Sequence, residues 1–251
     1  MRTENMTTLW KTPQSGLTLA EKEIHIWLAA LDLPSRRVEG LQEKLSIDER
    51  MKADCFRFDQ GRNRYIASFG ILKDILSLYI GVDPASVQIS YGSHGKPRLS
   101  DASGKDKLHF NLSHSEGSAV YVFARDYEVG VDIERIRDFP EMNKIVEHFF
   151  SAREKIAFGE LPSCVRREAF FRCWTRKEAV VKAIGEGLYQ PFDKFDVAMT
   201  PSEQSVKLSV KGDPKMPSHW LIQDLKPAPG FAGAFAVEDR SWKVCCWRWK
   251  G

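Results

Sequence analysis

The sequence predicts a mixed α+β protein, a pseudo-dimer of two similar α/β halves of about 100–115 residues each within one chain. The main observation is that one order of strand-like and helix-like segments occurs twice, at an offset of about 105 residues. Both copies also carry a Ser-x-x-Glu signature at the same point of that order. The composition agrees, because 43% hydrophobic and 28% charged residues are ordinary for a globular chain of 251 residues.

Each predicted half begins with a short apolar strand, Ile24–Leu31 in the first and Val129–Ile136 in the second. The Ser-x-x-Glu signatures follow at residues 46–49 and 151–154. A serine followed three residues later by glutamate is typical of a helix start, because each side chain can bond the backbone N–H of the other residue. The two signatures therefore predict a helix after each opening strand.

A long amphipathic helix comes next in each half. Apolar residues recur at helical spacing on one face of each segment, with one lysine among them: Tyr65, Phe69, Leu72, Ile75 and Leu76 in the first, and Phe170, Trp174, Lys177, Val180 and Val181 in the second. Glycines mark the helix ends, namely Gly81 in the first half and Gly185 and Gly187 in the second. Strand-like runs follow at Val87–Tyr91 and Phe195–Met199.

Both halves are predicted to close with a hairpin. The first would pair Ala119–Ala124 with Val129–Glu134, and the second would pair Gly233–Glu238 with Lys243–Trp249. These elements divide the chain into an N-terminal arm (1–20), an N-terminal half (21–128) and a C-terminal half (129–251). Because clefts between domains favour ligand sites, the active site is expected between the halves.

Charge and composition narrow the function classes. Lys and Arg number 37 against 34 Asp and Glu, a small excess that suits an acidic partner or a phosphate ligand and does not indicate nucleic-acid binding. Apolar runs stay well below the roughly 18–20 residues that span a bilayer. The five cysteines show no C-x-x-C spacing and predict neither a disulfide framework nor a zinc site. We therefore expect a cytoplasmic protein that does not enter a membrane.

The segment Gly130-Val-Asp-Ile-Glu134 carries the strongest chemical signal. Strand alternation places Asp132 and Glu134 on one face and Val131 and Ile133 on the other. Two carboxylates side by side repel each other unless a cation lies between them, and Mg²⁺ prefers oxygen ligands of this kind. The alternative is a solvated strand edge that carries two charges.

A second cluster lies on the long helix of the second half. Trp174, Glu178 and Lys182 share one helical face at i, i+4 and i+8. A Glu-to-Lys pair at this spacing is commonly a surface ion pair. Here the flanking residues are apolar, which favours a helix that is mostly buried and a pair that faces a cleft. Carboxylates with a nearby lysine also fit a metal-dependent nuclease, a rival of another class.

Two further segments suit phosphate binding. Gly95-Lys-Pro-Arg98 is a turn that can present Lys96 and Arg98 to phosphates, with Pro97 stiffening the backbone. Phe110-Asn-Leu-Ser-His-Ser115 groups Ser113 and His114, whose side chains can hydrogen-bond a pyrophosphate. A solvated loop and a structural turn histidine are the alternatives. The segment before the first long helix is also basic, with Arg50, Lys52, Arg57, Arg62 and Arg64.

In combination these motifs resemble the Sfp-type 4′-phosphopantetheinyl transferases. The resemblance covers roughly residues 20–200 and rests on five motifs in the family's order: 95–99, 110–115, 130–134, 149–154 and 174–188. It implies a pseudo-dimer of two similar halves, which agrees with the duplication in the sequence. It also implies transfer of the phosphopantetheine arm of coenzyme A to a serine of an apo acyl or peptidyl carrier protein, with Mg²⁺ or Mn²⁺, releasing 3′,5′-ADP.

The resemblance assigns roles to individual residues. It implies metal ligation by Asp132, Glu134 and Glu178. It implies contacts with coenzyme A from Lys52, Arg64, Lys96, Pro97, Arg98, Ser113, His114 and Lys182. Glu178, Lys182 and His114 are the expected catalytic residues, with Glu178 as the base and Lys182 beside the leaving phosphate.

The sequence departs from the family pattern at one position, and two rival functions remain to be compared. A lysine that the family often carries three residues before Lys52 is Glu49 here, and Arg50 is the candidate substitute for binding the 3′-phosphate. The nuclease interpretation leaves Ser113, His114 and the Gly95 turn without a role. A non-catalytic coenzyme A-binding protein would be expected to have lost a metal carboxylate or the catalytic lysine. Because one chain supplies both halves, a monomer is expected.

Overall fold

The computed structural model describes residues 10–13, 17–100, 108–185, 192–199, 205–206, 220–238 and 241–251. Within these ranges the chain forms two compact units. The first unit consists of Trp10–Asp126 together with Trp242–Gly251, and the second unit consists of Tyr127–Ser241. None of the helices in the described ranges is long and apolar enough to cross a bilayer.

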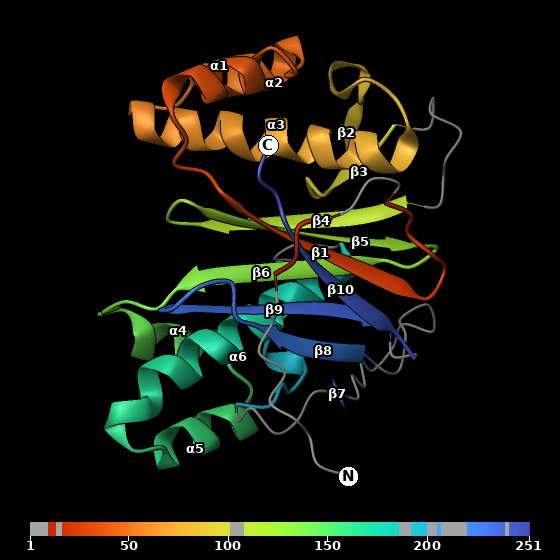
Figure 1. Ribbon diagram of the computed structural model, residues 1–251. Coiled ribbons are helices and arrows are strands. Elements are labelled where there is room, and N and C mark those ends of the chain that lie inside the picture. The colour runs from red at the N-terminus through yellow and green to blue at the C-terminus, as the bar shows by residue number, and fades with distance from the viewer. Residues whose placement is uncertain are drawn as a thin grey trace. The chain divides into compact units, whose positions relative to one another are not determined.

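A four-stranded sheet in the order β10-β1-β5-β4 forms the centre of the first unit. Its strands are β1 (Glu23–Ala30), β4 (Leu108–Ser115), β5 (Ser118–Arg125) and β10 (Lys243–Arg248). β1 runs antiparallel to β5 and parallel to β10. The helices α1 (Ser35–Gln42), α2 (Ile47–Asp54) and α3 (Asp59–Ile80) lie together on one face of this sheet (Figure 1).

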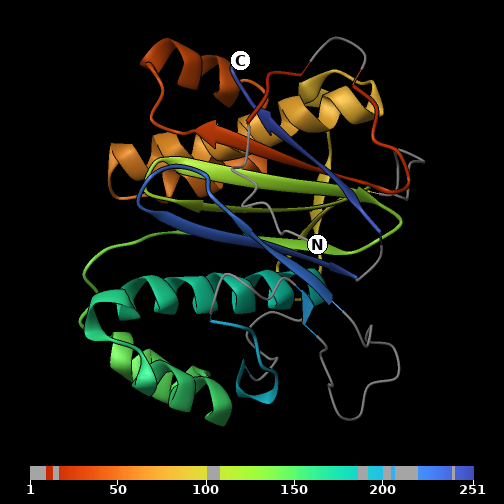
Figure 2. The same cartoon turned by 60° about the horizontal axis from the view of Figure 1, so that its bottom comes forward.

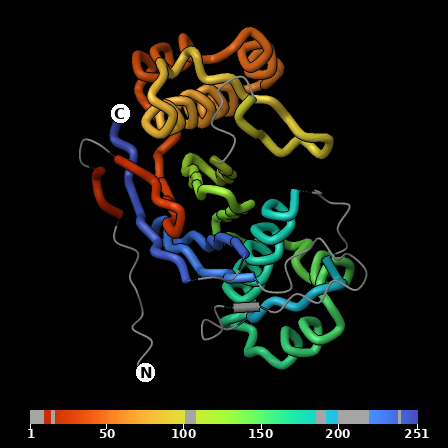
Figure 3. The backbone as a smooth tube through the Cα atoms, turned by 90° about the vertical axis from the view of Figure 1, so that its right-hand side faces the viewer, coloured from red at the N-terminus to blue at the C-terminus, as the bar shows by residue number. Residues whose placement is uncertain are grey.

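A small ribbon completes the first unit. A 3₁₀ turn, η1 (Pro84–Ser86), leads from α3 into β2 (Ile89–Tyr91), which pairs antiparallel with β3 (Pro97–Leu99). The ribbon is the yellow hairpin that projects to one side of the orange helices in Figure 3. The core of the unit packs the apolar face of α3, including Ile71 and Ile75, against inward side chains of β1 and β5.

The second unit has its own four-stranded sheet, in the order β6-β9-β8-β7. The strands are β6 (Val129–Arg135), β7 (Ser205–Val206), β8 (Trp220–Leu225) and β9 (Phe231–Glu238). Its helices are α4 (Met142–Phe149), α5 (Ala152–Glu160), α6 (Ser163–Ile184) and the 3₁₀ turn η4 (Phe192–Lys194). The long α6 runs along one face of the sheet, with α4 and α5 beyond it (Figure 2).

The predicted duplication is confirmed within the two units. The strand orders β1-β5-β4 and β6-β9-β8 correspond, and each unit has one 22-residue helix, α3 or α6, against its sheet. Both helices end at a glycine in the left-handed conformation, Gly81 at φ 71° and Gly185 at φ 83°. Gly187 lies outside the described residues. The two capping boxes are also present, because Ser46 and Glu49, like Ser151 and Glu154, exchange both hydrogen bonds.

The two predicted hairpins are wrong. β5 pairs with β4 and β1, and β6 pairs with β9, so residues 119–124 and 129–134 belong to different sheets. β10 does not pair with β9 either, but joins the first unit beside β1. Strand alternation identifies strands but not their partners, because pairing depends on contacts distant in sequence.

Three smaller expectations also need correction. Residues 242–251 group with the first unit rather than the second, because β10 pairs with β1. The described part of the predicted arm packs against the first unit. Lys11 forms an isolated parallel β-bridge with Trp247, and Leu19 is buried in the core of that unit. The predicted strand at 195–199 is an irregular segment after η4. Its backbone is held by side chains rather than by a neighbouring strand.

Candidate active site

The acidic pair of the second unit lies on β6, as predicted. Gly130, Asp132 and Glu134 alternate with the fully buried residues Val131 and Ile133. Asp132 is itself buried, with 4% of its surface exposed, while Glu134 is half-buried. A solvated strand edge would leave both carboxylates in water. The burial of Asp132 therefore argues against that alternative.

Gly130 determines how closely α6 approaches β6. A Cβ atom at this position would overlap the backbone of α6, at the carbonyl oxygen of Ala179 and the amide nitrogen of Ala183. Those neighbours are backbone atoms of a helix and cannot rotate away. The missing side chain at Gly130, and the small side chains at 179 and 183, let the helix lie directly over the strand.

That close approach brings Lys182 onto Asp132. The ammonium Nζ donates to Oδ1 of Asp132 at 2.6 Å, and the two side chains are 29% and 5% exposed. Burial lowers the pKa of Lys182, but the negative charges of Asp132 and Glu178 outweigh it and hold that pKa above its ordinary value. Lys182 is therefore a fixed positive charge inside the acidic cluster.

Glu178 lies one turn before Lys182 on α6 and is half-buried. Burial raises the pKa of its carboxyl group to about 7; Lys182 opposes the rise, and the charges of Asp132 and Glu134 add to it. A carboxyl group that titrates near neutral pH can accept a proton at working pH, which an ordinary glutamate does poorly. The predicted base thus has a pKa suited to that role.

The same three carboxylates are the predicted metal ligands. As placed, no three acidic, histidine or cysteine side chains of the described residues converge closely enough to hold a metal. Lys182 instead supplies the positive charge beside Asp132. The donor set still fits Mg²⁺ in its chemistry, because Asp132, Glu134 and Glu178 are hard oxygen ligands and their mutual repulsion favours a divalent cation among them.

The remaining predicted site residues lie in the first unit. Lys96 is 9% exposed and ends the turn in which the amide of Gly92 donates to its carbonyl at 2.9 Å. Pro97 and Arg98 open β3. Ser113 is buried near the end of β4 and His114 is exposed beside it.

Two basic residues have defined partners. Lys52 places its ammonium 4.1 Å from the centre of the Tyr91 ring, a cation–π contact on the exposed side of α2. Arg64 donates to both carboxylate oxygens of Asp32, at 2.7 and 2.8 Å. The fork of Arg64 is thereby held in one orientation.

Glu49 and Arg50, the two residues at the expected departure in α2, both have defined contacts. Its carboxylate closes the capping box of α2 and also pairs with the buried Lys73 at 3.0 Å. Arg50, the expected substitute, donates to the carbonyls of Glu43 and Leu45. Both side chains are thus engaged within the first unit, while the exposed ammonium of Lys52 lies over the ring of Tyr91.

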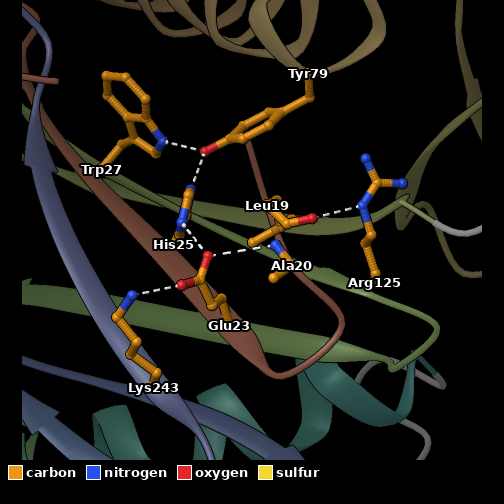
Figure 4. Close-up of polar contacts among 8 residues, drawn as sticks. All are labelled: Leu19, Ala20, Glu23, His25, Trp27, Tyr79, Arg125 and Lys243. Carbon is orange, nitrogen blue, oxygen red and sulfur yellow. Dashed lines mark hydrogen bonds and ion pairs between the residues drawn. The ribbon is translucent and has the colours of Figure 1, made fainter. Parts of the chain in front are cut away.

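The first unit has no acidic cluster at the corresponding place among its described residues. His25 and Trp27 stand on β1 where Gly130 and Asp132 stand on β6. Tyr79 matches Ala183, because each is the second-last residue of its helix, α3 or α6. Trp27 donates to the hydroxyl of Tyr79 at 2.8 Å, and that hydroxyl lies 2.8 Å from Nδ1 of His25 (Figure 4). Bulky side chains thus fill the layer between strand and helix in the first unit, so that among the described residues the acidic cluster lies in the second unit alone.

Sequence reasoning missed two features of the second unit. Strand alternation predicts Gly130 only as part of a strand, although a glycine inside a strand can also signal a close backbone approach. Helical spacing predicts Lys177 on the apolar face of α6 and indicates no partner for it. It forms a fully buried ion pair with Glu154 at 2.8 Å. The sequence does carry a signal for this ion pair: a lysine lies on an otherwise apolar helical face, and a capping-box glutamate precedes that helix.

A half-buried lysine on an acidic strand–helix cluster, beside a glutamate whose pKa is raised to about 7, is an arrangement suited to phosphate-transfer chemistry. Residues 128–241 match the family model described as the 4′-phosphopantetheinyl transferase superfamily. The chain belongs to this family. It is 35% identical to the 4′-phosphopantetheinyl transferase HetI of a Nostoc species over 96% of this chain and 98% of HetI.

Other relatives agree with this membership. The 4′-phosphopantetheinyl transferase Sfp of Bacillus subtilis is 26% identical over 77% of this chain and 82% of its own length. The 4′-phosphopantetheinyl transferase AcpT of Escherichia coli O157:H7 is 33% identical over 51% of this chain and 61% of its own. The resemblance to the Sfp-type enzymes is therefore confirmed, and the chain is an enzyme of the phosphopantetheinyl transferase class.

Proposed function

We propose that this enzyme transfers the 4′-phosphopantetheine group of coenzyme A to a serine hydroxyl of an apo acyl or peptidyl carrier protein. The serine oxygen forms a bond to the β-phosphorus, the bond from that phosphorus to the bridging oxygen breaks, and 3′,5′-ADP leaves. The observation that carries the proposal is the Asp132–Lys182 contact beside Glu178, within a chain that matches HetI along almost its whole length.

In this proposal Glu178 accepts the proton of the serine hydroxyl. A serine hydroxyl is a weak nucleophile, so a base within hydrogen-bond reach is required. Burial raises the pKa of the metal-free Glu178 carboxyl to about 7, which supports a role in taking up a proton. Lys182, anchored by Asp132, then offers its remaining N–H groups to the oxygen of the departing phosphate.

The residues that would hold a metal are Asp132, Glu134 and Glu178. Bound there, Mg²⁺ or Mn²⁺ would supply charge neutralisation for the pyrophosphate of coenzyme A. The preference of carboxylate oxygens for such hard cations supports this part of the proposal.

Coenzyme A would be bound by cations and polar groups of the first unit. Lys52 and Arg64 are the candidates for the 3′-phosphate, while Lys96, Pro97 and Arg98 would line the nucleotide pocket. Ser113 and His114, at the end of β4, would hydrogen-bond the pyrophosphate. A carrier protein partner, a monomeric enzyme and a cytoplasmic location complete the proposal, and sedimentation tests the monomer.

Intact-mass spectrometry tests the reaction directly. The enzyme is incubated with coenzyme A, Mg²⁺ and either an apo acyl carrier or an apo peptidyl carrier protein. We expect the carrier to gain one phosphopantetheine unit, and EDTA or Glu178→Ala to abolish the gain. Glu168→Ala, an exposed glutamate of the same helix, is the matched control and should retain activity. If neither carrier gains mass and coenzyme A does not bind, the proposal is wrong.

A further inference from the structure

A fully buried ion pair lies under the helix that carries Glu178 and Lys182. Nζ of Lys177 is 2.8 Å from Oε2 of Glu154, and the two side chains are 0% and 3% exposed. Buried charges are costly to remove from water and are retained where their remaining hydrogen-bonding groups are satisfied. The surroundings of this pair meet that condition.

The pair ties three segments of the second unit together. Oε2 of Glu154 accepts from the amide of Ser151 at the start of α5, at 2.8 Å. Oε1 accepts from the amide of Val197 at 2.7 Å. Nζ of Lys177 donates to the carbonyls of Phe192 and Phe195, at 2.6 and 2.7 Å. The start of α5, the middle of α6 and the segment 192–199 thus meet at one pair.

The first unit contains the same device at the corresponding positions. Glu49, the capping-box glutamate of α2, pairs with the buried Lys73 of α3 at 3.0 Å. Lys73 also donates to the carbonyl of Val87 at 3.1 Å, as Lys177 donates to Phe192. All three members recur at an offset of about 105 residues. The duplicated chain therefore has one such pair in the unit with the acidic cluster and an equivalent pair in the unit that lacks this cluster.

Only the second pair is next to catalytic side chains in sequence. Glu178 follows Lys177, so any rotation of α6 about its axis that moves Lys177 also moves Glu178 and Lys182. An apolar contact tolerates such a rotation, whereas a buried ion pair with four backbone hydrogen-bond partners does not. Displacements of about 1 Å in an active site can lower turnover by two orders of magnitude.

We infer that Glu154 and Lys177 are positioning residues for the proposed reaction: their pair fixes the rotation of α6 and so the placement of Glu178 and Lys182 against Asp132. The inference rests on the proposed function for its kinetic consequences. The Glu49–Lys73 pair, by contrast, stabilises the first unit and positions no catalytic group.

Matched substitutions in the two copies test this inference. Lys177→Met and Lys73→Met each remove one member of an equivalent buried pair, so both variants should lose thermal stability. At a temperature well below both melting points, Lys177→Met should lower kcat at least about tenfold, with the KM for the carrier unchanged within about twofold. Lys73→Met should keep kcat within about twofold of the parent enzyme. Equal losses of kcat, or an unchanged kcat in Lys177→Met, would overturn the inference.

A second readout does not depend on activity. Hydrogen exchange of the backbone amides of 178–184 should accelerate in Lys177→Met and remain at the parent rate in Lys73→Met. An unchanged exchange rate in both variants would contradict the positioning role even if the enzyme proved to have another activity. If Lys177→Met does not fold, Glu154→Gln, which keeps a carbonyl oxygen as a hydrogen-bond acceptor, serves for the same kinetic and exchange measurements, with the same outcomes expected.

Discussion

Lys182 and Asp132 come from elements about 50 residues apart in sequence, yet Nζ and Oδ1 lie 2.6 Å from each other in the second unit, with Asp132 buried and Lys182 half-buried. The contact depends on Gly130, two residues before Asp132 on the same face of β6, because that glycine admits the backbone of α6. The geometry of a strand–helix layer thus places a cation on an acidic strand.

Removing the ammonium of Lys182 should impair turnover more than binding. Lys182→Met is expected to lower kcat by roughly 10²–10³, the effect typical of losing one group that stabilises developing charge. The KM for coenzyme A should change little. Steady-state measurement of 3′,5′-ADP release tests this, with Lys194→Met, an exposed lysine of the same unit, as control. A variant that raises only the KM would show that Lys182 binds the substrate and does not act on the transition state.

Neutralising Glu178 should stabilise the metal-free protein. The raised pKa of Glu178 means that folding disfavours the ionised carboxylate. The free energy of unfolding therefore falls as pH rises from 4.5, the ordinary pKa of the group, to about 7, its pKa in the folded protein. At pH 8 with EDTA, Glu178→Gln should melt at least about 2 °C above the parent, the shift that roughly 1 kcal/mol produces in a chain of this size. Glu168→Gln should not. Mg²⁺ should raise the parent's melting temperature and have little effect on Glu178→Gln.

An absence of any Mg²⁺ shift in the parent, in the presence and absence of coenzyme A, would contradict the metal assignment. A lower melting temperature for Glu178→Gln at pH 8 would instead show that the ionised carboxylate makes favourable contacts in the fold.

Gly130 should tolerate no side chain. Gly130→Ala places a methyl group against backbone atoms of Ala179 and Ala183, so the free energy of unfolding should fall by about 1–3 kcal/mol, as in overpacked cores. Gly159→Ala is the matched control, because a Cβ at this exposed helical position meets no atom within 4 Å. It should be neutral or stabilising by up to about 1 kcal/mol. Urea denaturation measures the free energy of unfolding of both variants. Equal values for Gly130→Ala and Gly159→Ala would mean that α6 can move away from β6.

The first unit should discriminate coenzyme A from dephospho-coenzyme A. If Lys52 and Arg64 bind the 3′-phosphate, Lys52→Met and Arg64→Met should each reduce the ratio of kcat/KM for the two substrates roughly tenfold, the loss expected for one charge-assisted hydrogen bond. Arg36→Met, at an exposed position of α1, should leave the ratio unchanged. An unchanged ratio in Arg64→Met would show that its bidentate pair with Asp32 serves the fold alone.

His25 should make the first unit sensitive to acid. Burial lowers its pKa below the ordinary value of 6.5; Glu23 opposes the shift, and Lys243 adds to it. Glu23 lies at Nε2 of the His25 ring, and the hydroxyl of Tyr79, which is neutral at these pH values, lies at Nδ1. As pH falls below 6.5, the unfolded chain takes up a proton that the folded chain resists, so the free energy of unfolding should fall. His25→Gln should show a smaller fall between pH 7.5 and 5.5, whereas an identical fall would exclude His25 as its source.

Local sequence patterns predicted the elements well. The capping boxes at 46–49 and 151–154, both 22-residue helices and the alternation of β6 all follow from contacts between residues close in sequence. The acidic pair and the Glu178–Lys182 spacing follow for the same reason. Strand pairing did not, because β10 lies beside β1 rather than β9, and alternation carries no information on the partner.

The sequence by itself determined the repeated order of strands and helices, the position of the carboxylates on one strand face and the family to which the chain belongs. Only the tertiary structure decided which strands share a sheet, how closely α6 lies on β6, and that Glu154 and Lys177 are buried together. The reason is physical. Helix caps and side-chain alternation depend on neighbours a few residues away, whereas sheet order and buried ion pairs depend on the packing of segments that are distant in the chain.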